Sequence, residues 1–117
     1  MEPITQINLP RRITQNLKSV AGASDEEKVY NLAKQGAIAN LHECNNWISR
    51  FESRYGITFS DFASAWNQGQ VKNAHDYQTE TDFIEWEALE QEKEHWLSEI
   101  RHFNVLLALL VAHKKAA

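Results

Sequence analysis

The sequence has 117 residues and a mass of 13.5 kDa, which suits one domain of ordinary size. Apolar residues make up 43% and charged residues 24%, which is typical of a globular chain and excludes fibrous and wholly disordered proteins. The only cysteine, Cys44, excludes a disulfide framework and a multi-cysteine metal site, and it fits a reducing compartment. Pro10 is the last proline, so helix is allowed from there on and an all-β sandwich is excluded.

Membrane and secretory segments are not expected in this sequence. The apolar run 103–112 covers only 10 residues, well short of the roughly 20 that a membrane-spanning helix needs. The N-terminus lacks the apolar core of a secretory signal. We therefore expect a cytoplasmic protein without a membrane partner.

The net charge of −4 is unevenly distributed. Residues 1–23 carry three cations and one acid, a balance of +2, whereas residues 76–99 carry nine acids and one lysine, a balance of −8. A basic head can meet a polyanion while an acidic body meets a basic protein. Random surface charge is the alternative interpretation.

The N-terminal segment 4–9 has the period of two that is typical of a half-buried strand, with Gln6 and Asn8 on its outer face. A single strand cannot satisfy its backbone hydrogen bonds. The rest of the chain offers no convincing partner, because the extended link 57–59 is too short. We therefore expect the strand to pair with its own copy across a two-fold axis.

Four predicted helices follow this strand. Ser24 and the three acids after it form a capping box at the start of the second helix. Glycines at 22, 56 and 69 are stop signals. The expected helices run from Pro10 to Ala21, from Ser24 to about Tyr55, from Ser60 to Gly69 and from near Thr81 onward.

The last helix carries a heptad seam that is apolar at seven of its eight positions and interrupted only by Lys93. Such a seam folds back on residues 25–55 as a hairpin or lies in a groove of another protein. We expect the hairpin for residues 96–110 and partner contact for residues 70–92. The seam positions are Trp86, Leu89, Lys93, Trp96, Ile100, Phe103, Leu107 and Leu110.

The N-terminal motifs are the segment Ile4-Thr-Gln-Ile-Asn-Leu-Pro10, the stripe Ile13, Leu17, Val20 and Ala21, and the turn Gly22-Ala23-Ser24. The order strand, helix, tight turn, helix resembles the ribbon-helix-helix family of DNA-binding dimers, the Arc/MetJ type. The resemblance covers residues 4 to about 45. It implies a mainly α fold with a ribbon-helix-helix region over residues 1–45, followed by long helices over residues 46–117 that form a hairpin or an arm and bind a partner.

The second half carries Phe51-Glu-Ser-Arg-Tyr-Gly-Ile-Thr-Phe-Ser-Asp-Phe62 and Asp82-Phe-Ile-Glu-Trp-Glu-Ala-Leu89. These motifs resemble small prokaryotic proteins of toxin–antitoxin pairs. The resemblance implies a homodimeric antitoxin that represses its own operon by binding operator DNA and neutralises a toxin, often a small ribonuclease. A helical adaptor that binds protein without binding DNA is the alternative.

The same resemblance supplies the expected contacts. Asn and Gln amides match the N7 and N6 groups of adenine, and a helix N-terminus can hold a phosphate, although acids follow Ser24. The expected DNA-binding residues are Ile4, Gln6, Asn8, Arg11, Arg12, Lys18 and Ser24. The expected partner-binding residues are Phe62, Trp66, Tyr77, Phe83, Trp86 and Leu89, with Trp86 equally suited to the core.

No catalytic, metal or cofactor site is predicted. Glu92 with His95 and Glu99 with His102 form two Glu-x-x-His elements, as in di-iron bundles, but both lie on one helix. Cys44 lies on an apolar stripe, where a free cysteine behaves as a small hydrophobe. The sequence does not read as an enzyme.

Overall fold

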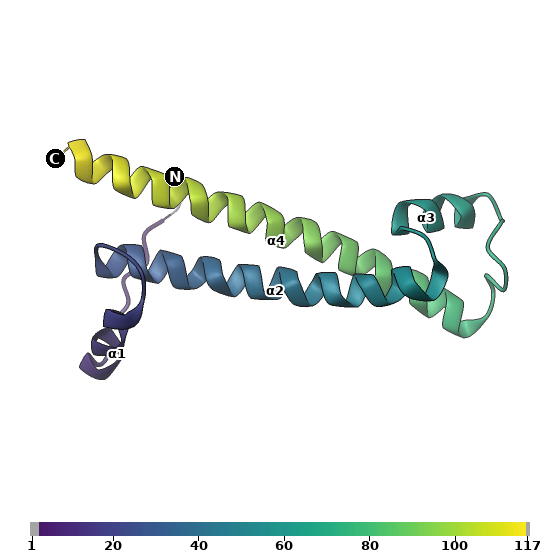
Figure 1. Cartoon of the computed structure of the whole chain (residues 1–117), viewed down its shortest axis with the longest axis horizontal. Helices are drawn as coiled ribbons and strands as arrows, with labels where there is room; N and C mark the ends of the chain where they lie inside the picture. The colour runs from purple at the N-terminus through teal and green to yellow at the C-terminus, as the bar shows by residue number, and fades with distance from the viewer. Residues whose placement is uncertain (1–2, 117) are drawn as a thin grey trace.

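The computed structural model describes residues 3–116, with side chains up to His113, and this part of the chain is mainly helical (Figure 1). The mainly α prediction is therefore confirmed, and a long helical arm is present. The elements are α1 (Arg11–Asn16), the 3-10 turn η1 (Leu17–Ser19), α2 (Asp25–Tyr55), α3 (Phe59–Asn67) and α4 (Tyr77–Ala116).

Local chemistry sets the ends of α2. The Ser24 side chain accepts a hydrogen bond from the Glu27 amide at 3.2 Å, as the capping box predicts. At the other end Gly56 adopts a left-handed φ of 72°, which glycine reaches without steric cost. Nothing between these signals interrupts the 31 residues of the helix. It also runs without a break across residue 45, the predicted boundary of the two regions.

α2 and α4 lie antiparallel as a long hairpin, and α3 packs at the end where the chain turns (Figure 1). The hairpin is elongated, with extents of 61 × 31 × 24 Å and a radius of gyration of 20.4 Å. A compact chain of this length would have a radius of gyration of about 13 Å. The one cluster of buried side chains among the described residues lies in the half of the hairpin near α3, where it joins α2, α3 and α4. The other half is a two-helix arm that ends at the start of α2 and the end of α4 (Figure 1). We call that end the open end.

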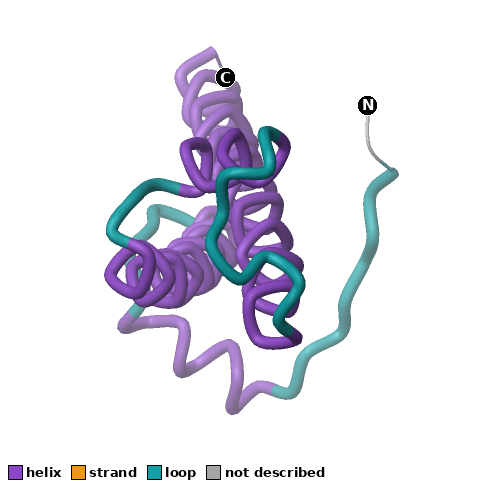
Figure 2. The backbone as a smooth tube through the Cα atoms, turned by 90° about the vertical axis from the view of Figure 1, so that its right-hand side faces the viewer, coloured by secondary structure: helices purple, strands orange, loops and turns teal. Residues whose placement is uncertain are grey.

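The predicted N-terminal ribbon strand is wrong. Residues 3–10 are extended and exposed, and no strand occurs within residues 3–116 (Figure 2). Ile7 and Leu9, which alternate with Gln6 and Asn8 and would form the inner face of such a strand, are 69% and 45% exposed. The alternation is present in the sequence, but backbone groups become a sheet only when a second strand pairs with them. Without that pairing, the ribbon-helix-helix fold is lost as well.

Two helix boundaries also differ from the expectation. The first helix is shorter, because six α-helical residues give way to the 3-10 turn at Leu17, which is buried. The last helix begins at Tyr77 instead of near Thr81, and the Asp76 carbonyl accepts from the Glu80 amide at 3.0 Å in its first turn. Tyr77 is thereby placed on a helix and not in a loop.

Candidate protein-interaction surface

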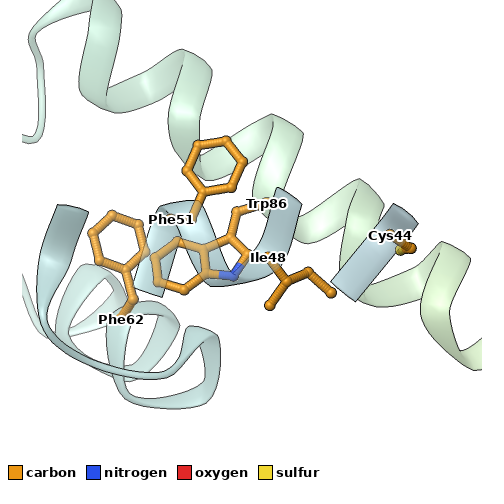
Figure 3. Close-up of a cluster of buried hydrophobic side chains, with 5 residues drawn as sticks. All are labelled: Cys44, Ile48, Phe51, Phe62 and Trp86. Atoms are coloured by element: carbon orange, nitrogen blue, oxygen red, sulfur yellow. The ribbon is translucent and has the colours of Figure 1, made fainter. Parts of the chain in front are cut away.

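An aromatic cluster fixes α4 against α2 and α3. Trp86 is completely buried, and its ring centroid lies 5.1 Å from that of Phe62 and 5.6 Å from that of Phe51 (Figure 3). Aromatic pairs at such distances add stabilisation beyond the area they bury. Cys44 and Ile48 of α2 complete the buried cluster. These contacts determine which side of α4 faces inward.

A buried carboxylate one turn before Trp86 helps to fix the same side of α4 against α2. Asp82 is 1% exposed and accepts three hydrogen bonds, from Tyr55 Oη at 2.6 Å, Arg54 Nη1 at 2.7 Å and Gln78 Nε2 at 2.8 Å. Two of these donors lie at the end of α2 and the third on α4 itself. Asp82 and its three donors therefore join α2 and α4 through hydrogen bonds that satisfy the buried carboxylate.

The environment of Asp82 shifts two pKa values. Burial raises the pKa of the Asp82 carboxyl, but the hydrogen bonds from Tyr55, Arg54 and Gln78 outweigh it, so the pKa lies below its ordinary value of 3.8. Burial, and then the hydrogen bond to Asp82, raises the pKa of Tyr55 to about 12. The carboxylate is therefore charged and the phenol neutral at neutral pH.

The opposite side of α4 carries two exposed apolar side chains among acids. Tyr77 is 84% exposed and Ile84 is 66% exposed, and they lie one heptad apart. At 100° per residue both fall roughly 160–180° from Trp86 around the helix. Exposed Glu80 and Glu87 lie beside them. We call Tyr77, Glu80, Ile84 and Glu87 the outer face of α4; it is an apolar pair with two acids beside it, of which Glu80 lies 3.9 Å from His75 Nδ1.

The six expected partner-binding residues separate into three groups. Phe62 and Trp86 lie in the core of the single chain, and of the two roles open to Trp86 the structure gives the core. Trp66, Phe83 and Leu89 are half-buried and pack against that core. Only Tyr77 is freely exposed. These six residues were predicted from their residue types, and Ile84 was not among them. Ile84 can be found from the sequence because it lies one heptad after Tyr77, on the side of the helix opposite Trp86.

The expected DNA-contacting residues do not form a single surface feature. Ile4, Gln6 and Asn8 are exposed on the extended segment, and the three cations Arg11, Arg12 and Lys18 are exposed on the short helical stretch that follows. Ser24 is half-buried, and its hydroxyl caps α2. A phosphate at this helix start would also meet the exposed acids Asp25 and Glu26.

The residues considered as metal ligands or as a nucleophile do not form a metal site or an activated thiol in the described part of the chain. Among residues 3–116 no group of three or more His, Cys, Asp or Glu side chains could hold a metal ion. Glu92 accepts from Trp96 Nε1 at 3.2 Å. Cys44 is buried, its thiol donates to the Leu89 carbonyl at 3.1 Å, and burial, followed by nearby Glu92, raises its pKa. A thiol kept protonated in this way is a poor nucleophile.

Comparison of the chain with family models, curated proteins and solved structures gave no match. Within the described part of the chain, no helix is both long and apolar enough to cross a membrane. The fold therefore defines a helical hairpin with a small aromatic core and an exposed acidic face.

Proposed function

We propose that this chain binds and masks another protein through the outer face of α4, as the cytoplasmic antitoxin of a toxin–antitoxin pair. The observation that carries the proposal is the exposure of Tyr77 and Ile84, to 84% and 66%, on a helix whose other side is held by a buried core. A rigid aromatic and aliphatic pair is the usual centre of a protein interface.

The acids around this pair select the chemistry of the partner. Glu80 and Glu87 are exposed beside Ile84, and the surrounding segment 76–99 has a balance of −8. A face of this sign attracts a basic surface and repels an acidic one. A small ribonuclease needs cations to hold the phosphates of RNA. The outer face of α4 would cover those cations, so inhibition is steric and electrostatic and needs no catalytic group.

Ile84→Lys is expected to weaken this complex by about 30-fold or more, since loss of an interface anchor costs about 2 kcal/mol and the new cation opposes a basic partner. The measurement is calorimetric titration of the purified chain with the protein encoded beside it. Ile38→Lys is the matched control, because Ile38 is an exposed isoleucine on the other helix, at 45%. Equal affinity of both variants would show that the outer face of α4 is not the contact.

Operator binding is a second proposal, favoured by a different observation. The extended segment 3–10 is exposed, and Arg11, Arg12 and Lys18 follow it in exposed positions. Such a segment can act as a basic arm along DNA, with Gln6 and Asn8 as the base-reading amides. This role requires no ribbon. It would let the chain repress its own operon.

For this second proposal we expect salt-sensitive, site-specific binding to upstream DNA, measured by fluorescence anisotropy against a scrambled duplex. Arg11→Ala with Arg12→Ala should flatten the salt dependence by about two units of slope per chain, because two phosphate contacts are removed. Asn8→Ala should lower the preference for the upstream duplex. Equal binding to both duplexes would leave a protein-binding adaptor that does not read DNA.

A further inference from the structure

A shallow groove runs between α2 and α4 on one side of the hairpin. At mid-length it is lined by Asn40, Glu43 and Trp47 of α2 and by Leu89 and Glu92 of α4. Trp47 is 46% exposed there. These residues identify which side of each helix forms the walls of the groove.

The walls become apolar toward the open end. On α2, steps of four and three residues back from Asn40 lead to Gly36, Ala33 and Val29, which are all exposed, and Leu32 beside them is 41% exposed. On α4, the same stepping from Glu92 passes the half-buried Trp96 and Glu99 and then reaches only apolar side chains, which are half-buried. They are Phe103, Leu106 and Leu110. We call this apolar end the groove face.

Gly36 is the most informative residue of the groove face. Glycine inside a helix costs about 1 kcal/mol relative to alanine. Nothing in its own chain requires it, because a Cβ built at Gly36 meets no atom within 4 Å. A mid-helix glycine with open space in front of it is suited to the close approach of another backbone. That backbone would come from outside the chain.

The size of the groove face fits a second copy of the chain. An aromatic side chain has a whole area of about 150–250 Å², and an aliphatic one has less. When each area is multiplied by the exposed fraction of its residue, the groove face together with the neighbouring Trp47 exposes on the order of 500 Å² of apolar surface. A standard interface of about 800 Å² per partner contains roughly 450 Å² of apolar surface. Two hairpins packed face to face also complete a four-helix bundle, in which a two-helix hairpin is half of the structure.

We propose that this chain forms a homodimer in which the groove faces of two hairpins pack together across a two-fold axis. The interface is isologous, so that the same residues serve both copies. It uses α2 and α4 and does not depend on the N-terminal segment. It also leaves the outer face of α4 near Tyr77 and Ile84 free, so the dimer does not rest on the proposed partner binding.

Sedimentation velocity of the full chain tests the proposal. We expect twice the mass of 13.5 kDa for the wild type and a shift to the monomer mass for Val29→Lys and Gly36→Leu. Gly36→Leu discriminates well between dimer loss and unfolding. Its side chain enters open space in the single chain and raises helix propensity, so the monomer itself should not be destabilised. Ile38→Lys is the matched control, since Ile38 is 45% exposed against 43% for Val29 and lies roughly 180° from it on α2.

Circular dichroism of each variant checks whether its helix content is kept, so that monomer formation is not mistaken for unfolding. A monomeric wild type at the highest concentration reached would overturn the dimer. So would an equal effect of Val29→Lys and Ile38→Lys, because only one of them lies on the groove face. Ile84→Lys should remain dimeric, which separates failure of this proposal from failure of the partner-binding proposal.

Discussion

Trp86→Ala is expected to lower the free energy of unfolding by about 4 kcal/mol, the largest effect of any single substitution in this chain. Trp86 is completely buried, and the rings of Phe51, Phe59 and Phe62 lie within 5.6 Å of it, centroid to centroid. Truncation to alanine removes both the buried area and these aromatic contacts. For a chain of this size the melting temperature should fall by about 15 °C.

Urea denaturation at fixed protein concentration measures this effect. Tyr77→Ala is the control, because it truncates an aromatic residue of the same helix that is 84% exposed and should change stability by no more than about 0.5 kcal/mol. Trp86→Phe should cost less than Trp86→Ala, since it keeps a ring and removes a buried Nε1 that has no hydrogen-bond partner. Similar losses for Trp86→Ala and Tyr77→Ala would contradict the assigned core.

Asp82→Ala has the second largest expected effect, about 2 kcal/mol near neutral pH, because it removes a buried, charged acceptor of three hydrogen bonds that hold α2 and α4 together. Most of this loss comes from the half-buried Tyr55, since Gln78 is exposed and the Arg54 side chain is 53% exposed, so both can bond to water instead. The loss should also depend on pH. The folded-state pKa of Asp82 is lowered, so its contribution is present above the unfolded value of 3.8 and disappears as pH falls through the folded-state pKa.

Urea midpoints of wild type and Asp82→Ala, compared from neutral pH down to below about pH 4, check this dependence. The gap between the two proteins should narrow at the acid end. Glu94→Ala is the matched control, since Glu94 is an exposed acid in the interior of the same helix. A gap that stays constant down to the lowest pH would exclude the charged carboxylate as its source.

Signals local in the sequence predicted the helices well. Ser24 and Gly56 mark the ends of α2 because a cap and a left-handed residue depend only on neighbouring backbone groups. The prediction of the N-terminal strand was wrong because a strand depends on a distant partner and not on neighbouring residues. A period of two describes which side chains alternate, whereas a strand exists only when a separate segment supplies hydrogen bonds.

The site was harder to predict because it depends on how α4 is turned in the hairpin. Trp86 lies on the heptad seam whether it is a core residue or a partner contact. Periodicity does not say whether that seam is covered by the same chain or by another protein. The cluster around Asp82 joins residues 28 positions apart, so only the register of the hairpin brings Arg54 to it. Once Asp82 and Trp86 are known to face inward, Tyr77 and Ile84 follow as the outer side.

Growth of bacteria that express the neighbouring gene tests most directly whether the outer face of α4 masks a basic protein. We expect that expression of this gene alone arrests growth and that co-expression of the wild-type chain restores it. Ile38→Lys should restore growth equally, whereas Ile84→Lys should fail at the same expression level. A neighbouring product that is harmless alone, or full rescue by Ile84→Lys, would contradict the account.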